Sequence, residues 1–102
     1  MCIALIGGIG GATRDYEKIA LEYGVTLRHF EKVCPRFEQK LYSMDAIIVF
    51  TNIVSHLART RALSSGKKTS VPVLMCHSCG MSSLRRCIDT IVRENHDKRR
   101  IQ

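Results

Sequence analysis

The chain has 102 residues, of which 45% are hydrophobic and 25% charged, a composition typical of one globular domain. No apolar run approaches the roughly 20 residues needed to cross a bilayer, and residues 1–11 lack the positive flank of a signal peptide, so we expect a cytoplasmic protein without a membrane partner. The formal charge of +7 would suit a polyanionic partner. Much of it falls in the tail from Arg93 to Arg100, which a solvated helix end explains more simply.

Strands and helices are expected to alternate along the chain. Four short apolar runs predict strands over residues 2–6, 25–30, 46–50 and 71–75. Helical spacing and capping signals predict a helix from Thr13 that stops at Gly24, a short one with Phe37, Leu41 and Met44 on one face, one from Ser55 to about Ser65 with Gly66 as its stop, and a last one from Ser82 or Ser83. This alternation indicates an α/β fold with a parallel sheet, whose simplest strand order is 2-1-3-4. Ligands of such sheets bind outside the carboxyl ends of the strands.

Several short segments follow one another in a characteristic order. They are Ile6-Gly7-Gly8, Tyr23-Gly24, the run Asp45 to Thr51 followed by Ser55-His56, and Val71-Pro72-Val73 before Cys76-His77-Ser78. From Ile3 to about Leu84, this order resembles the DUF2325 family, a set of small bacterial domains of unknown function. The resemblance implies a single DUF2325-like domain over residues 1–102 with a small Rossmann-like three-layer fold. It also suggests haem as a ligand, since some proteins of this type have been linked with haem binding, and it assigns no catalytic residue.

A glycine-rich turn follows the first predicted strand, over residues 7–11. Its N–H groups, with the Thr13 hydroxyl and the Arg14 cation, favour phosphate or carboxylate at a helix amino terminus. The segment matches neither a Walker A sequence nor GxGxxG, and no acidic partner for ribose is apparent where His29 and Glu31 end the second strand. Glycine that only turns the chain and packs helix on sheet explains the segment equally well.

A polar cluster follows the third strand. His56 can bind an anion or transfer a proton, whereas capping alone explains Ser55, and no nucleophile and base are paired by spacing. The anion site predicted from both segments comprises Gly8, Gly10, Gly11, Thr13, Arg14, Thr51, Asn52, Ser55 and His56.

Five cysteines, an odd number, form a poor disulfide framework in a reducing compartment. The segment Cys76-His77-Ser78-Cys79 resembles a redox CxxC beside a helix amino terminus, although thioredoxin-like proteins place theirs after an early strand. It is not the CxxCH of covalent haem attachment, and a zinc site would need His56, Cys34 or a second subunit to complete four ligands. Ordinary reduced cysteines are the simpler alternative.

Cys34-Pro35 is a dipeptide found where a cysteine thiolate is an axial haem ligand, because proline keeps the preceding residue extended. The haem or thiol candidates are Cys34, Cys76, His77 and Cys79. Cys2 and Cys87 are interpreted as core residues. We expect mild oxidation to join Cys76 to Cys79 or to link two subunits through Cys34.

These observations predict a non-enzymatic ligand-binding or redox-sensing module that uses exposed cysteines, with haem as its candidate cofactor. So small a sheet leaves two open edges, so a homodimer that covers one of them is expected. The alternative is an enzyme or nucleotide-binding domain that holds a phosphate at the glycine turn. A nucleic-acid accessory is the weakest hypothesis, because the chain has no aromatic stacking surface or recognisable motif.

Overall fold

A computed structural model describes the backbone of residues 1–78 and 80–101, with side chains as far as residue 95. Its strands are β1 (Cys2–Ile6), β2 (Thr26–Phe30), β3 (Ala46–Phe50) and β4 (Val73–Cys76). A 3-10 turn η1 (Gly10–Ala12) precedes α1 (Thr13–Glu22), and the later helices are α2 (Phe37–Tyr42), α3 (His56–Thr69) and α4 (Met81–Ile101). All pairings are parallel, in the order β2-β1-β3-β4, which confirms the predicted fold class and strand order.

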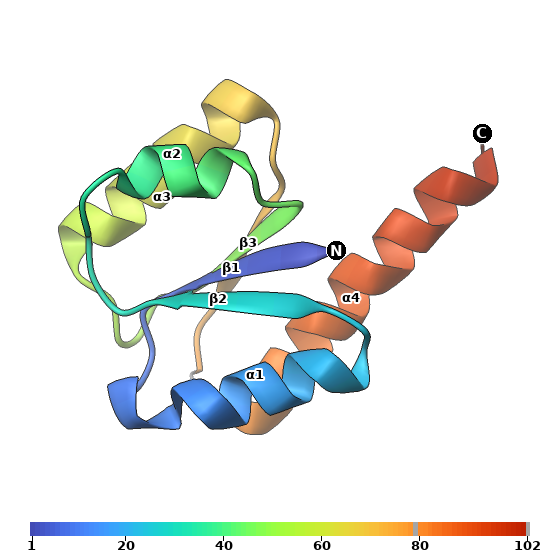
Figure 1. Ribbon diagram of the computed structural model, residues 1–102, viewed down its shortest axis with the longest axis horizontal. Helices are drawn as coiled ribbons and strands as arrows, with labels where there is room; N and C mark the ends of the chain where they lie inside the picture. The colour runs from blue at the N-terminus through green and yellow to red at the C-terminus, as the bar shows by residue number, and fades with distance from the viewer. Residues whose placement is uncertain (79, 102) are drawn as a thin grey trace.

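Helices cover both faces of the sheet (Figure 1). On one face α1 and α4 pack side by side, and the buried Leu5, Ile48 and Ile88 lie in the core beneath them. On the other face α2 and α3 enclose a second core around Phe37 and Ile47. Every residue of β3 is buried, as its continuous apolar run predicts for a central strand covered on both faces.

The two edges of the sheet are β2 and β4. On β2, Thr26 and Arg28 are exposed, and Val73, Leu74 and Met75 of β4 are only partly buried. These are the edges that a second copy would have to cover. The homodimer stays a prediction.

Helix α3 is longer than its sequence suggests. Gly66 was predicted to stop it, but the helix runs on to Thr69 and ends where Ser70 adopts a left-handed conformation. Gly66 instead packs against β4, since a Cβ there would lie 3.0 Å from the Val71 carbonyl oxygen and closer still to the side chain of Val73. The glycine therefore serves the close approach of helix and strand, not the end of the helix.

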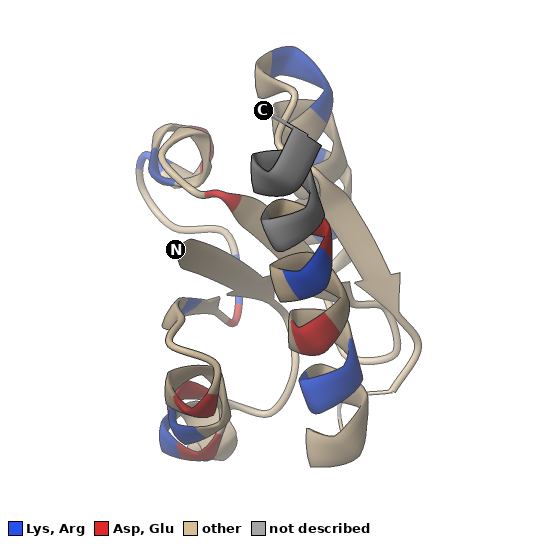
Figure 2. Cartoon of the chain, turned by 90° about the vertical axis from the view of Figure 1, so that its right-hand side faces the viewer, with Lys and Arg blue, Asp and Glu red and all other residues tan. Residues whose placement is uncertain are grey.

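Helix α4 extends beyond the sheet, and its described turns carry charges of both signs (Figure 2). Arg85 pairs with Glu22 of α1, and Arg93 pairs with Asp89 one turn earlier at 3.1 Å. The side chains of Lys98, Arg99 and Arg100, on which the basic tail was predicted, lie outside the described residues. Within the described ranges, no helix has both the length and the apolar character that a membrane crossing requires.

Candidate functional site

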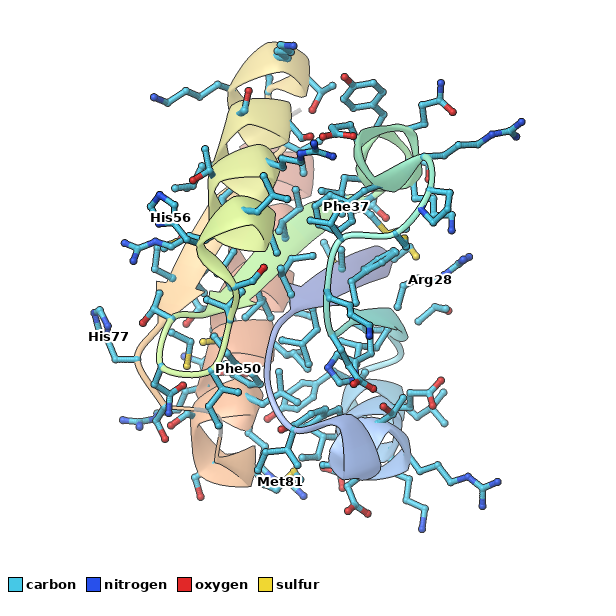
Figure 3. The ribbon with its side chains drawn as sticks, turned by 90° about the vertical axis from the view of Figure 1, so that its left-hand side faces the viewer. Arg28, Phe37, Phe50, His56, His77 and Met81 are labelled. Atoms are coloured by element: carbon cyan, nitrogen blue, oxygen red, sulfur yellow. The ribbon has the colours of Figure 1, made fainter. Side chains whose placement is uncertain are left out.

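The carboxyl ends of the four strands face one side of the molecule (Figure 3). Because the strands are parallel, the segments that follow them, residues 7–12, 31–36, 51–55 and 77–78, meet along this rim. The sequence predicted this arrangement for the glycine turn, the polar cluster and the cysteine segment. The Gly8 N–H donates to the Ile53 carbonyl oxygen at 2.7 Å, which ties the turn after β1 to the loop after β3.

The N–H groups of the glycine turn are largely occupied by protein acceptors. The Gly7 N–H donates to the Phe30 carbonyl oxygen, the Gly8 N–H to that of Ile53, and the Ile9 N–H to the Tyr16 hydroxyl. The Ala12 and Thr13 N–H groups donate to the carbonyl oxygens of Ile9 and Gly10. The Glu31 carboxylate lies directly against the turn, since a Cβ on Gly10 would lie 2.8 Å from its Cδ. A phosphate here would compete with these bonds and meet a negative charge.

His29 locks the glycine turn onto the end of β2. Its Nε2 lies 2.6 Å from Gly7 O, and because a carbonyl only accepts, Nε2 donates. Its Nδ1 lies 2.8 Å from the Thr13 hydroxyl, which donates to Gly10 O at 3.0 Å, and its ring packs edge-on against Tyr16. The Thr13 side chain therefore serves this network, and no side chain caps α1.

Replacing His29 by alanine is expected to lower the free energy of unfolding by about 1–3 kcal/mol, because the buried Gly7 carbonyl loses its donor. Urea unfolding followed by circular dichroism measures the change. The control is Arg28→Ala on the exposed face of the same strand, which we expect to stay within about 0.5 kcal/mol of the parent chain. Equal losses of stability in the two variants would show that His29 does not hold the glycine turn to β2.

Cys34 lies in a surface pocket of about 430 Å³ beside β2. Its thiol is partly buried and accepts a hydrogen bond from Lys40 Nζ at 3.6 Å. The pocket is lined by three cations, one carboxylate, one imidazole, one aromatic ring and this thiol, namely Arg28, Lys32, Lys40, Glu31, His29, Phe30 and Cys34. In the described part of the chain, no carboxylate pairs with any of the three cations. The pocket therefore combines a thiol with positive charge free to meet an anionic ligand.

The polar cluster after β3 serves mainly local structure. Ser55 caps α3 by accepting from the Ala58 N–H at 3.1 Å, as its sequence suggests. Thr51 connects β3 to the loop after β4, because its hydroxyl donates to Cys76 O at 3.3 Å and lies 3.0 Å from His77 Nδ1. His56 and His77 are both exposed and point outward in Figure 3.

The remaining predicted site residues are spread along the rim. Gly11 is exposed in η1, Arg14 is exposed in the first turn of α1, and Asn52 lies in the exposed loop after β3. Cys79 lies outside the described residues. Within the described ranges, no group of three or more metal-ligating side chains converges.

Two buried cysteines meet between β4 and α4, a contact that the sequence did not predict. Cys76 and Cys87 belong to one buried cluster and line the same groove, and the Cys76 thiol donates to Ser78 O at 3.1 Å. Burial is the main cause that raises the pKa of Cys87 to about 12, and the neighbouring Cys76 thiol raises it further. Side-chain alternation along β4 puts Leu74 and Cys76 on the face covered by α4, and this signal could have indicated the contact.

The parallel sheet, its helical layers and its carboxyl-end rim define a small Rossmann-like α/β domain. The chain belongs to the family DUF2325, described as an uncharacterized protein conserved in bacteria, whose model matches residues 2–91. No curated protein and no solved structure matches the chain.

Proposed function

We propose that this domain is a non-enzymatic ligand-binding and redox-responsive module, and that the pocket around Cys34 is its binding site. The observation that carries the proposal is the Cys34 thiol held 3.6 Å from the Lys40 ammonium in a pocket with two further cations. A cysteine sulfur beside a cation is a known type of metal ligand and of oxidant-reactive site. A partly exposed thiol in an electropositive pocket is the setting of responsive cysteines.

Haem fits the chemistry of this pocket. The Cys34 sulfur, followed by Pro35, would hold the haem iron, and Arg28 and Lys32 would offer positive partners for the two carboxylates. Its volume, about 430 Å³, lies within the roughly 300–1,000 Å³ of small-molecule sites. Bound haem would supply an iron centre that senses redox state or small gases, while the chain supplies the ligand sulfur and the cations.

The test is an absorption spectrum of the protein purified without added cofactor, followed by titration with ferric haem. We expect a Soret band in the parent chain, and in Cys34→Ser at least a tenfold weaker affinity together with a shifted band, because oxygen replaces the thiolate ligand. The matched control is Cys2→Ser, since Cys2 lies at the opposite end of the sheet and should leave both readouts unchanged. Identical haem spectra in the two variants would contradict the proposal.

A phosphate or nucleotide at the glycine turn is the alternative function, and it has less geometric support. Most N–H groups of the turn already donate to protein oxygens, and Glu31 lies against Gly10. Binding there would have to break bonds that hold the turn to β2 and to the loop after β3. Titration with inorganic phosphate distinguishes the two sites. If phosphate binds in the Cys34 pocket, Lys40→Glu should abolish binding; if it binds at the glycine turn, Arg14→Ala should abolish it.

A further inference from the structure

A shallow groove of about 400 Å³ runs between the edge strand β4 and helix α4. Its lining includes both thiols, Cys76 and Cys87, together with Arg86 and the hydroxyls of Ser83 and Thr90. The two cysteines are only 7% and 9% exposed, yet they line this open groove, so a small reagent can reach them from solvent. The groove is on the β4 edge, whereas the Cys34 pocket is on the β2 edge.

The surroundings of the two sulfurs differ. The Cys76 thiol, at the end of β4, donates to Ser78 O, whereas burial raises the pKa of Cys87 to about 12. Cys87 therefore stays protonated while Cys76 meets the oxidant, and the Arg86 guanidinium in the same lining adds a positive charge to the groove. Cys76 is thereby the sulfur prepared to attack, and Cys87 is the sulfur that resolves.

We infer that Cys76 and Cys87 form an intramolecular disulfide when a hydroperoxide enters the groove between β4 and α4. The Cys76 sulfur attacks one peroxide oxygen, the O–O bond breaks, and hydroxide leaves and is protonated to water, so Cys76 becomes a sulfenic acid. The Cys87 sulfur then attacks Cys76, the S–O bond breaks, and the departing hydroxide takes the Cys87 proton. In total two thiols and one hydrogen peroxide give one disulfide and two waters.

This pairing differs from the bond between Cys76 and Cys79 that the spacing of the sequence suggests. In the structure Cys76 shares its cluster and its groove with Cys87 of α4, a residue from the same stripe that places Leu84 and Ile88 in the core. The disulfide would tie the end of β4 to α4 across the segment 77–86. The disulfide does not involve Cys34, so its formation can be tested independently of the proposed haem site.

The experiment uses the full chain carrying Cys34→Ser, which removes the pocket thiol and leaves four cysteines. After stoichiometric hydrogen peroxide, free thiols are expected to fall from four to two per chain and to return with dithiothreitol. Trypsin digestion after alkylation should then give a disulfide between the peptide of residues 69–85 and that of residues 87–93, because cleavage follows Lys68, Arg85, Arg86 and Arg93.

The first peptide holds both Cys76 and Cys79, so a second variant assigns the sulfur. Adding Cys79→Ser should leave the link between the peptides intact, whereas Cys76→Ser should abolish it. Four unreacted thiols, or a disulfide closed inside the peptide 69–85, would overturn the inference. The peptide map of the Cys34→Ser chain shows whether Cys87 is linked to the peptide 69–85, and the two further variants assign the sulfur, so no variant of the buried Cys87 has to fold. A haem titration that fails while the link forms would count against the Cys34 site alone.

Discussion

Gly7→Ala is expected to lower the free energy of unfolding by about 2–5 kcal/mol, because it combines backbone strain with steric crowding. Gly7 has φ +87°, a left-handed conformation that costs an L residue about 1–2 kcal/mol. A Cβ there would also lie 2.8 Å from Val54 Cβ and 3.2 Å from Phe50 O, and closer still to Ile53 O. Relieving this crowding would push the loop after β3 away from the turn after β1.

Variants of two other glycines distinguish backbone strain from steric crowding as causes of the stability lost in Gly7→Ala. Gly24 has φ +70° and open space around its missing Cβ, so Gly24→Ala should cost only the conformational part, about 1–2 kcal/mol. Gly11 has neither a positive φ nor a neighbour within 4 Å, so Gly11→Ala should change stability by less than about 0.5 kcal/mol. Urea unfolding of the three variants provides the comparison. A Gly7 variant no less stable than the Gly24 variant would refute the close approach of the two loops.

Lys40→Glu is expected to weaken binding of ferric haem by about 10–150-fold, which corresponds to losing one charged hydrogen bond worth about 1.5–3 kcal/mol. The change removes the ammonium that donates to Cys34 Sγ and places a carboxylate among the pocket residues. Both effects act against the thiolate and against an anionic ligand. Titration monitored at the Soret band measures the affinity.

The matched control is Lys67→Glu, in the last turn of α3. It makes the same change in net charge at an exposed position outside the pocket lining, so affinity should change by less than about twofold. Equal weakening in the two variants would mean that haem responds to the overall charge of the protein. The Cys34 pocket would then have no special role, even if haem binds elsewhere.

The sequence by itself determined the elements and their order. Continuous apolar residues in β3 and helical spacing in α4 are local patterns, and alternation of strands with helices leaves few topologies for a chain of this length. The same logic placed the glycine turn, the cluster after β3 and the cysteine segment on one rim. Local capping chemistry likewise identified Ser55 as a cap and Gly24 as a stop.

Tertiary structure alone decided which of these residues meet. Gly66 stays inside α3 because β4 approaches it, and the turn's N–H groups are used by oxygens from β2, α1 and the loop after β3. Lys40 reaches Cys34 because α2 follows the loop that carries the thiol, and Cys87 meets Cys76 because α4 packs back onto β4. Periodicity within one segment specifies which face a residue occupies. The partner across that face depends on the register between segments far apart in the chain, because side-chain contacts extend over only a few ångströms.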